Sequence, residues 1–237
     1  MFELNKLYHM DCMQAMKEIP DKYFEIAIVD PPYGRKEHGG KNHSGYVKQK
    51  NGSRIYVRHD GYENRGWDNK PAGKEYFDEL MRVSKNQIIW GCNYFDYPLS
   101  GGRIIWDKCN DGANQCGAEI AYNSINNRVE IFRFLWRGMM QGKSVTEGTV
   151  QRGNKKRNEK RIHPTQKPVE LYEWIISQYA KAGDRILDTH AGSGSCCIAA
   201  HRMRHEWLGF EIDGYYFEKA QQRICQEQAY MTVYDFI

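Results

Sequence analysis

Short apolar runs alternate with amphipathic stretches along this chain, most regularly toward its C-terminus. Apolar runs predict strands at residues 7–10, 25–29, 87–90, 103–106, 119–122, 129–135, 185–188 and 206–210. Apolar positions that recur every three or four residues predict helices at 12–19, 74–83, 169–179, 193–205 and 214–227. Because strands and helices alternate, we expect an α/β fold with a mostly parallel sheet flanked by helices.

Two long polar segments interrupt this pattern, at residues 34–70 and 137–161. Both are longer than ordinary connections, and loops of such length usually serve a function or are disordered. The second segment contains the run RGNKKRNEKR, which offers little that could pack in a core. We therefore expect both segments to be insertions in a single domain that spans residues 1–237.

Composition adds constraints on partners and compartment. The formal net charge of +4 allows a polyanionic partner without requiring one. Seven cysteines, an odd number with no C-x-x-C pair, predict free thiols in a reducing compartment. The N-terminus lacks the basic and apolar regions of a signal peptide, and no apolar run approaches the ~20 residues of a membrane span. We expect a soluble, cytoplasmic protein that does not contact a membrane.

The run IVDPPYG, at residues 28–34, ends a predicted strand on Asp30 and then turns at Pro31 and Pro32. Taken alone, it is a strand followed by a turn, with Tyr33 at the rim. Its interpretation therefore depends on the rest of the chain.

A glycine turn follows the strand at 185–188, in the run RILDTHAGSGS. Gly192 and Gly194 allow a tight turn and close approach of the backbone to a ligand at the start of a helix. The G-x-G-x-x-G pattern of dinucleotide sites is absent, because residue 197 is Cys. A nucleoside ligand without pyrophosphate fits better. The next strand ends GFEID, where Glu211 is placed to accept hydrogen bonds from ribose hydroxyls.

Four motifs in one order, DPPYG (30–34), HPTQKP (163–168), LDTHAGSGS (187–195) and GFEID (209–213), resemble the DNA amino-methyltransferases that use S-adenosylmethionine (SAM). D-P-P-Y before the glycine motif is the circularly permuted order of the β class. The stretches NQIIWGCNYF and RIHPTQKPVELYEWI also resemble the small adenine-N6 methyltransferases of phages and prophages. The resemblance implies a Rossmann-like methyltransferase fold with a seven-stranded sheet. In it, the glycine-motif strand and the D-P-P-Y strand lie side by side.

The resemblance also implies a set of SAM-binding residues. These are Asp11, Asp30, Thr165, Lys167, Asp188, His190, Ala191, Gly192, Ser193, Gly194, Glu211 and Asp213. Asp11 is expected near the SAM adenine and Lys167 near the SAM carboxylate. The alternatives are a helix N-cap for Asp11 and helix-entry positions for Thr165 and Lys167. Many family members carry D-P-F where this chain has Asp188-Thr189-His190, so His190 either takes the phenylalanine's packing role or is an ordinary polar residue at the cleft edge.

The chemistry assigns a role to each D-P-P-Y residue. An exocyclic amino group is a poor nucleophile, because its lone pair is delocalised into the ring. The Asp30 carboxylate and the Pro31 carbonyl would accept its two N–H bonds and help localise that lone pair. Pro32 stiffens the turn, and the Tyr33 ring offers a face on which a flipped-out base can stack.

The two polar segments are expected to face double-stranded DNA through basic residues. In the first segment these are Arg35, Lys36, Arg54 and Arg58, and in the second they are Arg152, Lys155, Lys156 and Arg157. Phosphate contacts of this kind supply affinity that depends on salt. We expect the second segment to be the main target-recognition region and the first to order on DNA.

The function expected on these grounds is SAM-dependent methylation of adenine N6 in DNA, with S-adenosylhomocysteine as product. Cytosine-N4 methylation remains an alternative, and a catalytically silent DNA-binding module is a more distant one. His201 and His205 have the spacing of a metal pair but lack the H-E-x-x-H glutamate, so we expect no metal. The resemblance leaves a homodimer as one possible assembly.

Overall fold

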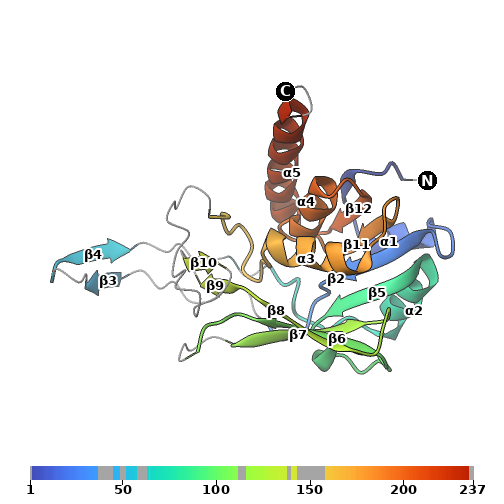
Figure 1. The fold of residues 1–237 in the computed structure, drawn as a ribbon, viewed down its shortest axis with the longest axis horizontal. Coiled ribbons are helices and arrows are strands. Elements are labelled where there is room, and N and C mark those ends of the chain that lie inside the picture. Colours follow the sequence, from blue (N-terminus) through green and yellow to red (C-terminus); the bar gives the residue numbers. More distant parts are fainter. Residues whose placement is uncertain are drawn as a thin grey trace.

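The computed structural model describes residues 2–36, 45–48, 52–57, 63, 65–111, 116–137, 140–142 and 158–234 (Figure 1). Its helices are α1 (Cys12–Lys17), α2 (Lys74–Val83), α3 (Val169–Tyr179), α4 (Ser195–Arg202) and α5 (Gly214–Tyr234), with a 3-10 turn η1 (Cys92–Tyr94). The main sheet contains β1 (Lys6–His9), β2 (Phe24–Val29), β5 (Ser84–Trp90), β6 (Gly102–Asp107), β7 (Ala118–Asn123), β8 (Val129–Arg133), β11 (Arg185–Asp188) and β12 (Glu206–Glu211). Two hairpins lie outside it, β3 (Gly45–Lys48) with β4 (Arg54–Val57) and β9 (Leu135–Arg137) with β10 (Met140–Gly142).

The main sheet has the strand order β1-β12-β11-β2-β5-β7-β6-β8 within the described ranges. The strands from β1 to β5 in that order run parallel to their neighbours. Only β7 is antiparallel, to both β5 and β6, while β8 pairs parallel with β6 at the edge. The sheet is mostly parallel, as predicted, and in the described part of the chain it has eight strands rather than seven.

Strand β2 is buried on both faces, which explains its uninterrupted apolar sequence. Ile26 and Ile28 belong to the core cluster under α3 and α4, on one face of the sheet. Ala27 and Val29 belong to the cluster under α1 and α2, on the other face. Because side chains alternate along a strand, this one segment joins both cores and fixes the position of the residue that follows it.

Strands β11 and β2 are direct neighbours, with Ile186 opposite Ile26 and Leu187 opposite Ala27. This confirms the prediction that the glycine-motif strand and the D-P-P-Y strand lie side by side. Ligands of doubly wound sheets bind outside the carboxyl ends of such strands. Asp30 and Asp188, which stand at the ends of these two strands, therefore reach the same edge of the sheet.

Local periodicity predicted several elements to the residue. The bounds predicted for 74–83, 169–179 and 185–188 are those of α2, α3 and β11. Helix α4 begins later than predicted, because Gly194 has φ of 74° and precedes its first turn. The run at 129–135 divides into β8 and β9, since the Phe134 N–H turns to the Asp107 carbonyl at 3.0 Å.

The hairpin β3–β4 lies within the polar segment 34–70, and the sequence pattern did not predict it. Tyr46 pairs with Tyr56 across the hairpin, and their rings meet edge to face with centroids 5.2 Å apart. Both side chains are exposed. Figure 1 shows the hairpin projecting away from the main sheet.

All seven cysteines carry free thiols, as predicted. None of the described helices is long and apolar enough to span a membrane.

Candidate active site and cofactor pocket

The carboxyl ends of three parallel strands form the site. Asp30 follows β2, Asp188 ends β11, and Glu211 ends β12 on the far side of β11. The glycine loop between Asp188 and α4 lies among them. Sequence segments far apart in the chain therefore meet at one edge of the sheet, as predicted.

Asp68 holds the D-P-P-Y turn in place. Its Oδ1 accepts the backbone N–H groups of Tyr33 and Gly34, each at 2.8 Å. The Ala72 N–H donates to the Pro32 carbonyl at 3.1 Å, a few residues further along the chain. The end of the first polar segment thus holds the D-P-P-Y turn, and no pattern in the sequence indicated this role for Asp68.

The Tyr33 ring packs over the backbone of Gly91, which has φ of 69°. A Cβ atom at position 91 would lie 2.1 Å from Cε1 of this ring, so only glycine leaves it room. Tyr94 stacks on the ring with centroids 5.0 Å apart, and the Tyr33 phenol donates to Asp30 Oδ1. Tyr94 therefore covers one face of the Tyr33 ring in this conformation.

Lys167 is buried beside Asp30, with 3% of its surface exposed. Its Nζ lies 2.5 Å from Asp30 Oδ2 and 3.1 Å from Glu119 Oε2. Burial raises the pKa of Asp30, and the Lys167 ammonium acts against this rise. Lys167 was expected to bind the SAM carboxylate. In the structure its ammonium pairs with Asp30, which follows β2, and with Glu119 on β7, and Lys167 also lines the adjacent pocket.

A pocket opens next to this cluster and contains most of the predicted cofactor residues. Asp30 and Pro32 line it on the catalytic side. The other predicted residues that line it are Thr165, Lys167, His190, Ala191, Gly192, Ser193 and Glu211. The pocket is also lined by residues that the sequence had not marked as site residues: Trp67, His163, Gln166, Tyr172, Ser195 and Ile212.

The donor and acceptor groups of this pocket fit SAM. Glu211 accepts the backbone N–H groups of Gly192 and Asp213, each at 2.8 Å, and its two oxygens keep further lone pairs for ribose hydroxyls. Among the described residues, the Trp67 indole N–H is buried without a partner, and an acceptor on a ligand would satisfy it. Burial lowers the pKa of His163 to about 3 and that of His190 to about 4, so neither imidazole opposes the positive sulfonium.

Four predicted cofactor residues, Asp11, Asp188, Gly194 and Asp213, do not line the pocket and have contacts within local structure. Asp11 caps α1 by accepting the Met13 N–H at 2.8 Å, which was the alternative role considered for it. The Asp188 carboxylate accepts the His190 N–H at 3.2 Å, and burial raises the pKa of Asp188 to about 8. Gly194 packs under α5, and Asp213 accepts N–H groups in the first turn of α5.

The basic residues predicted to face DNA are only partly described. Arg35 is exposed and donates to the Tyr94 hydroxyl at 2.6 Å, next to the Tyr33 stack. Lys36 is exposed nearby, and Arg54 is exposed on the β3–β4 hairpin. The remaining predicted residues, Arg58, Arg152, Lys155, Lys156 and Arg157, lie outside the described residues.

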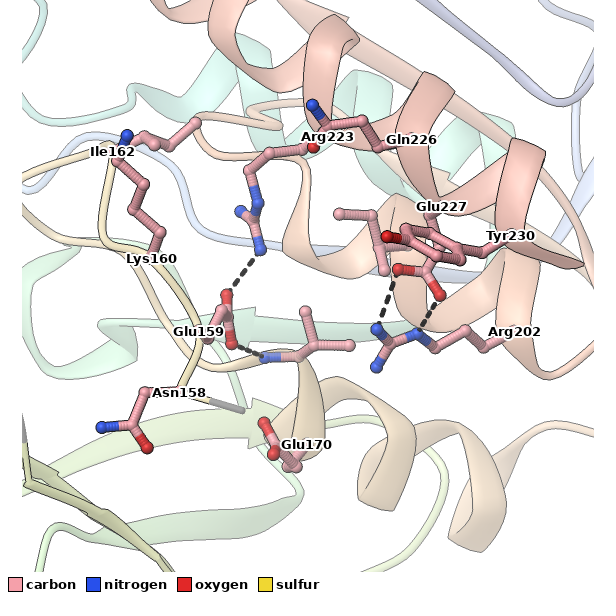
Figure 2. Close-up of a pocket in the computed structure, with 12 residues that line it drawn as sticks. Asn158, Glu159, Lys160, Ile162, Glu170, Arg202, Arg223, Gln226, Glu227 and Tyr230 are labelled. Carbon is pink, nitrogen blue, oxygen red and sulfur yellow. Dashed lines mark hydrogen bonds and ion pairs between the residues drawn. The ribbon is translucent and has the colours of Figure 1, made fainter. Parts of the chain in front are cut away.

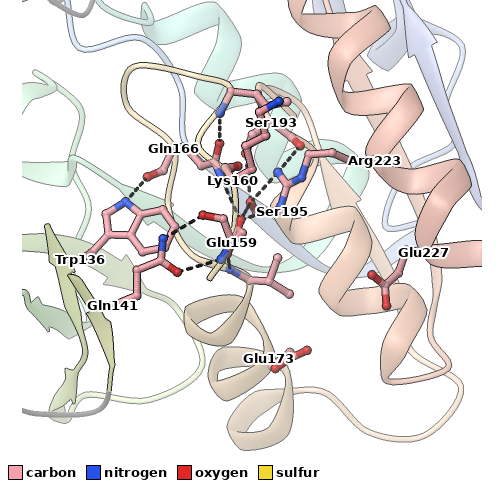
Figure 3. Close-up of polar contacts among 12 residues, drawn as sticks. Trp136, Gln141, Glu159, Lys160, Gln166, Glu173, Ser193, Ser195, Arg223 and Glu227 are labelled. Atoms are coloured by element: carbon pink, nitrogen blue, oxygen red, sulfur yellow. Dashed lines mark hydrogen bonds and ion pairs between the residues drawn. The ribbon is translucent and has the colours of Figure 1, made fainter. Parts of the chain in front are cut away.

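Glu159 joins the second polar segment to the pocket wall (Figure 3). Its backbone N–H donates to the Gln141 side-chain amide oxygen at 2.9 Å, and its C=O accepts from the Gln141 side-chain N–H at 2.8 Å. These two bonds join residue 141 of that segment to residue 159. Its carboxylate accepts from Ser195 at 3.2 Å and from Arg223 at 2.6 Å. Glu159, which lies within the basic run, thus connects Gln141 to Ser195 at the start of α4.

A second cavity lies behind this network, between α3, α4 and α5 (Figure 2). Two ion pairs lie along it, Arg223 with Glu159 at 2.6 Å and Arg202 with Glu227 at 2.7 Å. In the described part of the chain, no group of three or more His, Cys, Asp or Glu residues is placed to hold a metal ion.

Known proteins resemble this chain in sequence and in fold. A family model of the N6/N4 type, described as DNA methylase, matches residues 118–222. The type II methyltransferase M2.DpnII of Streptococcus pneumoniae is 27% identical over 254 residues, covering 93% of this chain and 90% of that protein. The type II methyltransferase M.HinfI of Haemophilus influenzae is 23% identical over 245 residues, covering 93% of this chain and 68% of that protein.

Two solved structures share the fold. The crystal structure of the M1.HpyAVI–SAM complex superposes with a TM-score of 0.55 at 18% identity, over 92% of this chain and 98% of that one. The PvuII DNA methyltransferase, described as cytosine-N4-specific, superposes with a TM-score of 0.51 at 11% identity, over 94% and 90%. Residues 118–222 of the chain thus match the DNA methylase family model, and nearly the whole chain is similar in sequence to type II methyltransferases.

Proposed function

We propose that the protein transfers a methyl group from SAM to the exocyclic N6 of an adenine in double-stranded DNA. The observation that supports this most directly is the shared pocket. Asp30 and Pro32 of the D-P-P-Y turn line the same pocket as Gly192 and Ser193 of the glycine loop, although the two motifs are far apart in sequence. SAM, when bound, supplies an electrophilic methyl group.

Asp30 and Pro31 would act on the target amino group. Asp30 Oδ1 accepts one N–H of that group, and the Pro31 carbonyl accepts the other. Because both acceptors favour positive charge on nitrogen, they stabilise the charge that develops as the bond to the methyl carbon forms. The partly buried Asp30 carboxylate can then take the surplus proton at Oδ1, since desolvation raises its pKa and favours the protonated form.

The Tyr33 phenol donates to Asp30 Oδ1 in the structure, so this hydrogen bond has to break before the target amino group can donate to Oδ1. Burial raises the pKa of Tyr33, and the neighbouring Asp30 adds to that rise, so the phenol keeps its proton and remains a donor. We assign Tyr33 two successive roles. It protects the carboxylate before the base arrives, and its ring then contacts the base.

The cofactor would be held by residues of the pocket wall. Glu211 would accept the ribose hydroxyls, and the backbone of the glycine loop would lie against the ligand at Gly192. Thr165 and Ser193 would contribute hydroxyls at the pocket wall, and Tyr172 and Trp67 would exclude water. The cavity measures about 260 Å³ before any adjustment to a ligand.

Cytosine-N4 methylation is the second candidate, because a cytosine-N4-specific enzyme shares the fold. The Asp of D-P-P-Y favours adenine, whereas S-P-P-Y would favour cytosine. Incubating DNA with radiolabelled SAM, digesting it and separating the nucleosides distinguishes the two. We expect N6-methyladenine. N4-methylcytosine would move the assignment to the second candidate, and absence of label would refute both.

The polar segments at 34–70 and 137–161 would provide the DNA-facing surface, and the enzyme would act in the cytoplasm, where free thiols persist. The homodimer implied by the family resemblance is checked by sedimentation velocity on the same preparation, with and without DNA.

A further inference from the structure

The buried ammonium of Lys167 has all three of its donors in use. Its Nζ lies 2.5 Å from Asp30 Oδ2, 3.1 Å from Glu119 Oε2 and 3.3 Å from the Tyr33 hydroxyl. A lysine ammonium has three N–H bonds, and here each one has an oxygen within reach. Binding a carboxylate of a ligand would require Lys167 to release one of these partners.

Glu119 continues the charged cluster away from the reaction centre. Its Oε2 faces Lys167, and its Oε1 lies 2.5 Å from Lys108. Lys167 and Lys108 together lower the pKa of Glu119 to about 2, against the effect of burial, so this carboxylate is ionised. Two carboxylates and two ammonium groups alternate along the cluster. This satisfies the requirement that buried charges be paired.

The two oxygens of Asp30 are held by donors of different strength. Oδ2 accepts from the Lys167 ammonium, and Oδ1 accepts from the neutral Tyr33 phenol. A charge-assisted hydrogen bond is about twice as strong as a neutral one, and separating a buried ion pair leaves an uncompensated charge. An incoming amino group therefore displaces the phenol from Oδ1 more easily than it displaces the ammonium from Oδ2.

We propose that Lys167 and Glu119 are positioning residues that lock Oδ2 of the catalytic Asp30 and leave Oδ1 to the substrate. This inference rests on the function proposed above for Asp30. Neither residue touches the reacting atoms. Lys167 orients the carboxylate and acts against the rise in its pKa, and Glu119 holds Lys167 in place through the ion pair at 3.1 Å.

The proposal predicts a signature in the pH dependence of kcat. Removing the charge of Lys167 removes the interaction that lowers the pKa of Asp30, so ionisation of Asp30 then requires a higher pH. Removing the charge of Glu119 has the opposite sign, because Glu119 raises the pKa of Asp30. The titratable groups that face Asp30 are Lys167, Glu119, Tyr33, Tyr76, Tyr172 and Asp188.

The test compares Lys167→Met, Lys167→Arg and Glu119→Gln with the wild-type enzyme. Single-turnover methylation is measured at saturating SAM and DNA from pH 5 to 9, and SAM affinity is measured by calorimetry. For Lys167→Met we expect kcat at pH 7 to fall about a hundredfold, the order of loss that a misplaced catalytic group produces. We expect the acid limb of its pH–kcat profile, the fall of kcat at low pH, to move to higher pH. Its SAM affinity should stay at the wild-type value.

The other variants separate charge from shape. Lys167→Arg keeps the positive charge and should keep the acid limb at its wild-type position. Glu119→Gln should lower kcat about tenfold, because Lys167 loses its ion pair with Glu119. This variant should not move the acid limb to higher pH. The exposed Lys181→Met is the matched control for loss of a lysine and should behave as wild type.

Several results would overturn the proposal. They are a wild-type kcat and pH profile in Lys167→Met, an equal upward shift of the acid limb in Lys167→Arg, or loss of SAM affinity as the only defect. If Lys167→Met does not fold, as judged by circular dichroism, Lys167→Arg and Glu119→Gln decide the question. If the wild-type enzyme forms no methylated base, the proposed function fails, whereas activity that is insensitive to these substitutions refutes only the positioning role.

Discussion

Gly91 lies under the ring of Tyr33, and replacing it by alanine tests whether the position of that ring matters for catalysis. Two effects act at this residue. Its φ of 69° is in the left-handed region, where a non-glycine residue costs roughly 1–2 kcal/mol. In addition, the new Cβ would lie 2.1 Å from Tyr33 Cε1, whereas carbon atoms pack at about 3.5 Å or more. The ring therefore has to retreat by about 1.4 Å, the difference between these two distances.

This displacement separates the Tyr33 phenol from Asp30 and strains the D-P-P-Y turn that carries both residues. A misplacement of about 1 Å near the reacting groups can cost roughly a hundredfold in rate. We expect Gly91→Ala to lower the single-turnover rate by about that factor while SAM affinity, measured by calorimetry, is unchanged. Its free energy of unfolding should fall by more than backbone strain alone accounts for.

Gly183→Ala is the matched control. Gly183 also has a positive φ, of 87°, but no atom lies within 4 Å of its Cβ position. This variant should lose roughly 1–2 kcal/mol of stability and keep full methylation activity. In a double-mutant cycle, Gly91→Ala should destabilise the Tyr33→Ala protein less than the wild type, since the clashing ring is gone. A Gly91→Ala enzyme with the wild-type rate, or additive effects in the cycle, would refute the reasoning.

Three other predictions follow from the site and its surroundings. Asp30→Ala should abolish methyl transfer and leave SAM binding nearly intact, and retained turnover in a filter-binding methylation assay would contradict the proposed mechanism. Neutralising Lys155, Lys156 and Arg157 together should flatten the dependence of DNA affinity on salt, read from the slope of log K against log salt concentration, and an unchanged slope would argue against DNA contact there. Burial lowers the pKa of His190 from 6.5 to about 4, so the unfolded chain binds more protons between these values and stability falls as pH drops through this window. His190→Gln should reduce that fall in urea unfolding series at pH 7, 5.5 and 4.5, and an equally steep loss would rule out this origin.

The sequence was sufficient wherever one short segment carries its own information. The periodicity of 74–83 and 169–179 predicted α2 and α3 to the residue, because the face that an amphipathic helix buries can be read locally. The order of the D-P-P-Y and glycine motifs, interpreted through the family resemblance, predicted that β2 and β11 are neighbours. Most of the cofactor pocket followed from that pairing.

Local patterns could not predict the partners of the polar side chains at the site. Lys167 lies in a recognised motif, yet nothing near it in sequence indicates that its ammonium meets Asp30 and Glu119. The same is true of Asp68, whose carboxylate holds the turn at Tyr33 from 35 residues away. Asp11 shows the converse. Its place in a motif resembles that of a ligand residue, and in the structure its side chain caps α1 by accepting the Met13 N–H two residues along the chain.

What local sequence predicted and what only the tertiary structure decided differ for a physical reason. Helix faces, strand runs and glycine turns depend on backbone sterics and on burial, and both act over a few neighbouring residues. The charge state and orientation of Asp30 depend instead on which ammonium, phenol and second carboxylate the sheet register brings within about 3 Å. That choice belongs to the tertiary structure, because β2, β7 and the start of α3 meet only after the sheet has formed.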